Sequence, residues 1–123
     1  MRIILGLCAA TLAIGALLIW RGTQLPTHYG NFTGATKAPV ADLIERPKEF
    51  LDKAVLVEGA VRQQCKTMGC YFFFVSGEKM LRVDLEQLTM NAPMREGRPV
   101  RVEGQLVPFD HSYQLVASAV EFQ

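Results

Sequence analysis

A long apolar run at the start of the chain limits its architecture more than any other feature of the sequence. Residues 3–20 contain no charged residue and no proline, and Trp20 and Arg21 close the run. Eighteen helical residues extend about 27 Å, which is enough to cross the hydrocarbon core of a membrane once. We therefore expect residues 1–21 to form a single N-terminal transmembrane anchor.

A cleaved signal peptide is the alternative interpretation of this segment. Such peptides have an apolar region of about 7–15 residues that ends in small residues at the cleavage site. The best match, Ile14-Gly15-Ala16, lies inside the apolar run, and this position favours an uncleaved anchor. Either interpretation takes the rest of the chain across the membrane. With Arg2 on the cytoplasmic side, we expect a single-pass protein of the bacterial inner membrane whose domain lies in the periplasm.

The rest of the chain has the composition of an ordinary globular domain. The 123 residues are 50% apolar, but sixteen of the first twenty are apolar, so the remainder is only about 44% apolar. The chain holds 13 basic and 12 acidic residues, and leaving out Arg2 and Arg21 gives the remainder a net charge of −1. Nucleic-acid-binding domains usually carry a basic surface, so we expect no nucleic-acid partner.

The pattern beyond the anchor predicts a linker, a short helical segment and a series of strands. Residues 22–39 are rich in glycine, proline and threonine and predict a linker. Residues 40–51 have apolar positions at helical spacing that Pro47 interrupts, which predicts two short helical turns. A further short helix is expected over residues 85–90. Alternating apolar and polar residues predict five strands, at 55–61, 71–75, 81–85, 100–106 and 113–122.

Two of the predicted strands share the pattern V-x-V-E-G followed by x and an apolar residue. A glycine at the same point of 55–61 and 100–106 predicts a bend or bulge that lets a small sheet coil. Five strands with a short helix between the third and fourth predict an all-β domain with short helices. We expect a five-stranded OB-fold barrel over residues 40–123, preceded by one transmembrane helix. A small sandwich is the alternative.

Two stretches resemble known envelope proteins. ADLIERPKEFLDKAVLVEGAV, residues 41–61, resembles the opening of bacterial OB-fold proteins of the envelope. PMREGRPVRVEGQL, residues 93–106, resembles the matching part of the cytochrome c maturation haem chaperone family. That family has one N-terminal anchor and a periplasmic OB-fold, so the resemblance implies a role in cofactor or cytochrome biogenesis. The family attaches haem through a tail after the barrel, and with nothing after Gln123 we expect no haem carriage.

Two cysteines mark a candidate site between the first two strands. Cys65 and Cys70 lie in CKTMGCY, which is similar to a C-x3-G-C-aromatic motif of small uncharacterised envelope OB-fold proteins. In an oxidising compartment a disulfide is the first hypothesis, and closing so short a loop contributes about 2 kcal/mol. Alternatively, two thiolates and the Met68 thioether suit monovalent copper, with His111 as a possible further ligand. A redox-active pair and a Cys70–His111 nucleophile are weaker alternatives.

The second strand carries consecutive aromatic residues, which therefore lie on both of its faces. One face is expected to be core, and Tyr71 and Phe73 are candidates for an interface. Because no catalytic group is identifiable, we expect a non-enzymatic, membrane-anchored binding or assembly protein with a membrane-protein partner. A structural accessory subunit of a membrane complex, or a copper-binding protein that uses Cys65, Met68 and Cys70, is the alternative.

Overall fold

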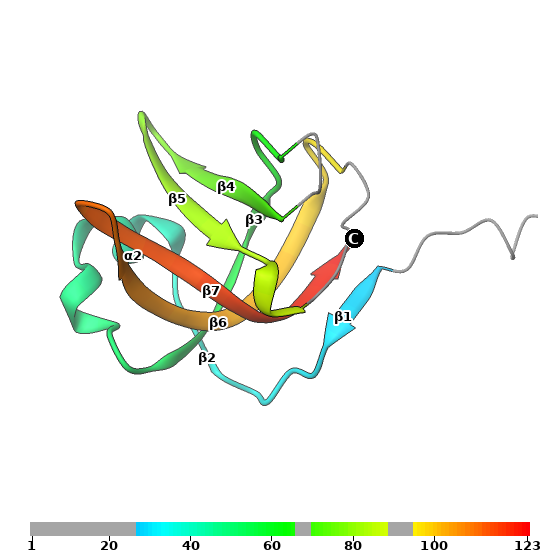
Figure 1. The fold of residues 1–123 in the computed structure, drawn as a ribbon, viewed down its shortest axis with the longest axis horizontal. Helices are drawn as coiled ribbons and strands as arrows, with labels where there is room; N and C mark the ends of the chain where they lie inside the picture. Colours follow the sequence, from blue (N-terminus) through cyan, green and yellow to red (C-terminus); the bar gives the residue numbers. More distant parts are fainter. Residues whose placement is uncertain (1–26, 66–69, 89–94) are drawn as a thin grey trace, which may run out of the picture.

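The fold of the described chain is mostly β-sheet with a few short helices (Figure 1). A computed structural model describes residues 27–65, 70–88 and 95–123. The predicted transmembrane segment, residues 1–21, lies outside them, and within them no helix has the length and apolar character needed to cross a membrane. The expected all-β class with short helices is confirmed.

All five predicted strands are present, and two short strands precede them. The strands are β1 (His28–Gly30), β2 (Thr36–Lys37), β3 (Ala54–Ala60), β4 (Tyr71–Ser76), β5 (Lys79–Asp84), β6 (Pro99–Phe109) and β7 (Ser112–Phe122). The helical turns are α2 (Val40–Glu45) and the 3-10 turns η1 (Pro47–Glu49) and η2 (Glu86–Leu88). Pro47 separates α2 from η1, as its missing N–H requires.

The strands form one sheet with the order β2-β3-β6-β7-β5-β4, and β1 pairs with β7 beside this path. The β6–β7 hairpin is antiparallel, whereas β5 pairs with β7 in parallel. In the described part of the chain the sheet does not close, because β3 and β4 are not paired as a ladder; the segment after β3 meets β4 through an isolated bridge between Arg62 and Phe73. The expected five-stranded barrel is therefore corrected to an open sheet of seven strands over these residues.

The two glycines of the repeated V-x-V-E-G pattern allow different close contacts. A Cβ atom at Gly104 would lie 2.2 Å from the carbonyl oxygen of Val116, and the β6–β7 register shifts between Glu103 and Gly104. A bulge is therefore present beside Gly104, but its extra residue is Ser118 of β7, since Glu103 pairs with Ala119 and Gly104 with Ala117. At Gly59 a Cβ atom would lie 2.6 Å from a ring carbon of Phe74, so this ring packs directly on the backbone of β3.

The core is formed by the inward-facing residues of the strands together with α2. The ring centres of Phe72 and Phe74 lie 5.3 Å apart at 90°, and both side chains are fully buried. Leu43 from α2 covers this part of the sheet with 1% of its surface exposed. Figure 1 shows the β4–β5 hairpin leaning across the long, curved β6 and β7 strands.

Residues 27–37, the N-terminal strap, run along the sheet and extend its hydrogen bonding. β1 pairs antiparallel with the second half of β7, and β2 pairs in parallel with the start of β3. The ring of Tyr29 lies 6.2 Å from that of Phe122 in an edge-on contact. Within the linker expected over residues 22–39, short edge pairing at residues 28–30 and 36–37 and one aromatic contact therefore hold the strap on the sheet.

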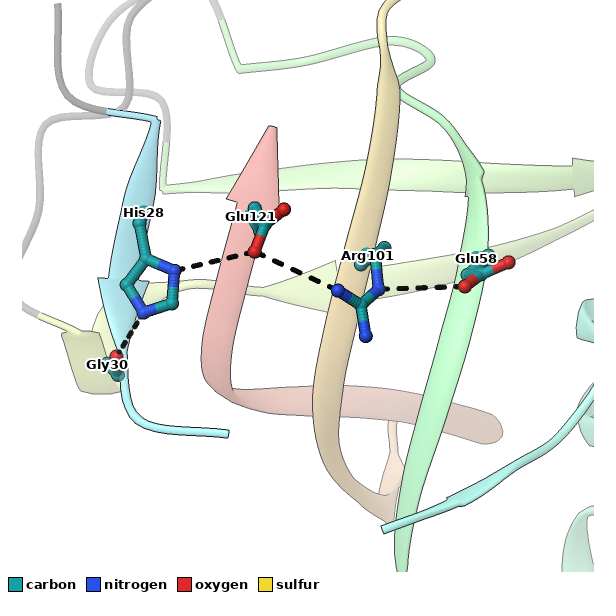
Figure 2. A network of polar contacts seen from close by, with 5 residues as sticks. All are labelled: His28, Gly30, Glu58, Arg101 and Glu121. Carbon is teal, nitrogen blue, oxygen red and sulfur yellow. Dashed lines mark hydrogen bonds and ion pairs between the residues drawn. The ribbon is translucent and has the colours of Figure 1, made fainter. Parts of the chain in front are cut away.

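A row of alternating acidic and basic side chains, which we call the charge row, crosses four neighbouring strands and includes the strap (Figure 2). His28 on β1 lies 3.6 Å from Glu121 on β7, which lies 3.8 Å from Arg101 on β6. Arg101 in turn lies 3.6 Å from Glu58 on β3. Each of these contacts joins directly paired cross-strand residues. Because all four side chains are partly exposed, the row contributes little to stability but reinforces the strand register.

Candidate functional site

The two faces of β4 separate its aromatic residues into a core pair and an outer pair. Phe72 and Phe74 point into the core and are fully buried. Tyr71 and Phe73, the candidate interface residues, are half-buried on the outer face, with ring centres 5.9 Å apart. The alternation of the strand therefore places one aromatic pair where another molecule can reach it.

An arginine from the neighbouring strand lies over this outer pair. The guanidinium carbon of Arg82 lies 4.2 Å from the ring centre of Tyr71 and 4.8 Å from that of Phe109. The Nε–H of Arg82 donates a hydrogen bond to Oε1 of Gln114 at 3.0 Å. Two cation–π contacts and one hydrogen bond thus hold the guanidinium in place.

We call the residues Tyr71, Phe73, Met80, Arg82 and Phe109 the β4–β5 outer face. A hollow of about 340 Å³ lies on it and is also lined by residues 110–113 of the β6–β7 hairpin. Met80 and Phe109 are 46% and 41% exposed, which is unusual for large apolar side chains. An exposed apolar surface around a fixed cation is typical of a binding surface.

The cysteine pair lies at the other end of β4. The backbone N–H of Cys65 donates to the carbonyl oxygen of Tyr71 at 3.0 Å, which brings Cys65 alongside the start of β4. Both cysteines are free thiols in the structure and are half-buried. Burial, together with a hydrogen bond to the Cys65 thiol, raises the pKa of Cys70. The two thiols are therefore close together, and the environment of Cys70 favours its protonated form.

The other residues predicted for a metal site do not join the cysteines. Met68 lies outside the described residues. His111 is fully exposed at the tip of the β6–β7 hairpin, on the hollow with Met80, whereas Cys70 lies before the opposite end of β4. Over residues 27–65, 70–88 and 95–123, no group of three or more His, Cys, Asp or Glu residues is placed to hold a metal ion.

A buried carboxylate on β6 was not expected from the sequence. Glu103 alternates with the apolar residues of the strand, which predicts that it lies on the polar face. Glu103 is 2% exposed, and its two oxygens accept hydrogen bonds from the backbone N–H of Thr33 at 3.0 Å each. The Thr33 hydroxyl and the N–H of Ala35 also donate to it. Burial by itself would raise the pKa of Glu103, but these hydrogen bonds hold it below its ordinary value. Glu103 therefore attaches the N-terminal strap to the sheet.

A larger hollow of about 750 Å³ lies away from all of the predicted site residues. It is formed by β2, η1 and the start of β3. Phe50 and Val55 contribute apolar surface, and Lys37 and Lys53 contribute charge. Of these two lysines, Lys37 already pairs with Glu58 at 2.8 Å. The hollow holds no feature that specifies a ligand, so we place the candidate site on the β4–β5 outer face.

Comparison with known proteins supports the fold and leaves the function open. No protein-family model matches the chain, and no curated protein matches it. Among solved structures, the hypothetical protein ygiW from E. coli is similar with a TM-score of 0.55 at 13% identity, over 81% of this chain and 100% of that chain. This neighbour is OB-fold-like, so the described domain is related to OB-folds in architecture.

A second similar structure belongs to a much larger protein. A putative aspartyl-tRNA synthetase from Leishmania major Friedlin matches with a TM-score of 0.55 at 17% identity, over 75% of this chain. This chain spans only 21% of the length of the synthetase chain. At these identities both similarities concern the fold alone.

Proposed function

We propose that this chain is a non-enzymatic binding or assembly protein, anchored in the bacterial inner membrane by one span and folded in the periplasm. Its role would be in cofactor or cytochrome biogenesis. The β4–β5 outer face carries this proposal, because it combines a fixed guanidinium with exposed apolar side chains. We infer that strands β3 to β7 are the five strands of a partly open OB-fold, in which the second and third strands and adjoining loops bind ligands.

Several features support a role without catalysis. The raised pKa of Cys70 disfavours the thiolate that a nucleophilic mechanism requires. His111, the general base that such a mechanism would use, lines the hollow at the far end of β4.

Residues 3–20 support the anchor because they form an uncharged run of membrane-spanning length.

An accessory subunit of a membrane protein complex is a second proposal that rests on the same surface. The exposed side chains of Val75, Met80 and Phe109 would then pack against a membrane-protein partner. A stoichiometric partner that co-purifies in mild detergent would favour this alternative over a soluble ligand.

A copper-binding role through Cys65, Met68 and Cys70 is a third proposal, supported by the proximity of the two thiols. Mass spectrometry of purified protein, with and without thiol alkylation, distinguishes it from a disulfide. A stable bond between the cysteines with no uptake of copper(I) would exclude the copper role and leave the disulfide.

The binding role can be tested by photocrosslinking in intact cells. A benzoyl-phenylalanine at Met80 on the β4–β5 outer face is compared with the same residue at Glu45, which is exposed on α2, the helix that packs on the core side of β4 and β5 through Leu43. We expect a discrete adduct from position 80 that position 45 does not give. Identical products from both positions, or none from position 80, would contradict the assignment of this face.

A further inference from the structure

The guanidinium of Arg82 is fixed by the fold before any ligand arrives. Its Nε–H donates a hydrogen bond to Gln114 at 3.0 Å, and its guanidinium carbon lies over the rings of Tyr71 and Phe109. These contacts restrict the side chain without using the charge in an ion pair. A guanidinium positioned in this way loses little conformational freedom when it binds an anion through its terminal N–H groups.

The charge of Arg82 has no acidic partner. Every Asp and Glu of the sequence lies in the described part of the chain, and none of them is within ion-pair distance of Arg82. Two other arginines differ in this respect. Arg46 pairs with Asp42 and Glu49, and Arg101 bridges two further carboxylates. A half-buried cation without a counter-ion favours an anion from outside the chain.

The surroundings of Arg82 add an apolar requirement to this ligand. The hollow beside it is about 340 Å³, which suits a small molecule, and Met80 and Phe109 line it with exposed apolar surface. On the same face of β5, the carboxylate of Asp84 accepts a hydrogen bond from the backbone N–H of Glu86 at 3.1 Å. The carboxylate of Asp110 lies at the tip of the β6–β7 hairpin. A polyanion would need several cations along its path, whereas this hollow offers one arginine.

We propose that Arg82 is the anion-binding residue of a subsite for a small amphiphilic oxyanion, either a carboxylate or a phosphate. The oxyanion accepts hydrogen bonds from the terminal N–H groups of Arg82, and the adjoining apolar part of the ligand packs on Met80 and Phe109. This inference rests on the proposed binding role of the β4–β5 outer face and names the chemistry of its ligand.

The test uses the full chain in nanodiscs of zwitterionic lipid, with arginine Nε–H groups observed by nuclear magnetic resonance. Benzoate and phenyl phosphate are titrated as the two oxyanion classes, and benzamide serves as a neutral molecule of similar shape. We expect at least one anion to shift the Arg82 signal, with a dissociation constant on the order of 1 mM. Benzamide should bind at least tenfold more weakly, and the stronger anion identifies the oxyanion class.

Variants separate the charge of Arg82 from the stability of the fold. Arg82→Gln should weaken binding of the anion at least tenfold, whereas Arg46→Gln removes the same charge from an ion pair on the helical segment and should leave binding unchanged. Gln114→Ala frees the Nε–H and should weaken binding less than Arg82→Gln does. Circular dichroism establishes that each variant is folded, and the benzamide comparison in the unmodified chain needs no variant.

Three outcomes would overturn the proposal: no response to either anion, equal binding of benzamide, or equal losses in Arg82→Gln and Arg46→Gln. Tighter binding of a single-stranded oligonucleotide at the same face would also overturn it. The crosslink from position 80 distinguishes a failure of the anion subsite from a failure of the proposed binding role. If that crosslink persists in Arg82→Gln while the anions fail to bind, the face binds a partner of other chemistry. If the crosslink is also absent, the proposed binding role fails with it.

Discussion

Replacing Glu103 by glutamine should release the N-terminal strap from the sheet. The carboxylate of Glu103 accepts hydrogen bonds from the N–H and hydroxyl groups of Thr33 and from the N–H of Ala35. Glutamine keeps the shape of the side chain but replaces one accepting oxygen with an NH2 group that opposes these donors. Hydrogen bonds to a buried charge contribute about 1.5–3 kcal/mol each, so we expect a loss of about 2 kcal/mol in the free energy of unfolding. For a domain of this size, that corresponds to a fall in Tm of about 8–16 °C.

A matched control lies in the same sequence pattern. Glu58 occupies the equivalent V-x-V-E-G position in β3, but it is exposed and pairs with Lys37 and Arg101 at the surface. Glu58→Gln should therefore change stability much less than Glu103→Gln. Thr33→Val removes one donor and should cost about 1 kcal/mol. Because Thr33 and Glu103 share the same contact, the double variant should cost less than the sum of the single variants.

Urea unfolding of the full chain in detergent, followed by circular dichroism, measures these differences. Hydrogen exchange adds a local readout, because the amides of β1 should lose protection in Glu103→Gln before those of β6 and β7 do. Equal stability losses for Glu103→Gln and Glu58→Gln, or unchanged protection of β1, would refute the role assigned to Glu103.

The same carboxylate predicts a dependence of stability on pH. The folded pKa of Glu103 is lower than its ordinary value, so near pH 4 the unfolded chain binds more protons than the folded one. The stabilisation is complete above the ordinary carboxyl pKa of about 4.3 and is lost as the pH falls through the lower folded pKa. The difference in stability between the unmodified chain and Glu103→Gln should therefore shrink below about pH 4 and stay constant above about pH 6.

Three further predictions concern other contacts. Gly104→Ala should lower stability by about 1–3 kcal/mol in urea unfolding, because the new Cβ atom would meet the carbonyl oxygen of Val116; an unchanged midpoint would show that β6 and β7 can separate there. In oxidised protein, Cys65→Ser with Cys70→Ser should cost about 2 kcal/mol, and with reductant present the difference should vanish; a loss that persists under reductant would exclude the disulfide as its cause. Arg101→Gln should cost less than about 1 kcal/mol and show little effect in high salt, since its partners are exposed; a loss above about 2 kcal/mol would contradict the weak surface character of the charge row.

The strands β3 to β7 were predictable because the apolar residues that alternate with polar ones along them are the residues buried in the core of the sheet. The two short strands of the strap were not, since Thr36–Lys37 and His28–Gly30 are too short for any periodicity and lie among glycine and proline residues. Their structure depends on the edges that β3 and β7 offer, which no local pattern in residues 22–39 encodes.

The same limit explains which site residues could be found. Tyr71 and Phe73 stand out as aromatics on one strand face. The role of Arg82 depends instead on Gln114 and Phe109, which are brought to it by β7 and β6 from about thirty residues along the chain. The outer position of Arg82 is visible in its alternation with buried Leu81 and Val83, but the absence of a carboxylate within ion-pair distance of it is a property of the folded sheet.

If residues 3–20 anchor the chain as proposed, the attachment of the strap sets how far the domain can travel from the membrane. For a chain anchored through residues 3–20, a free linker over residues 22–39 would reach about 60 Å, whereas residues 22–26 alone reach about 17 Å. The volume open to the domain scales with the cube of this reach, so with the shorter reach it is smaller by a factor of about 44 than with a free linker. A partner in the same membrane would meet the domain at a correspondingly higher effective concentration, so even weak contacts on its surface would be occupied.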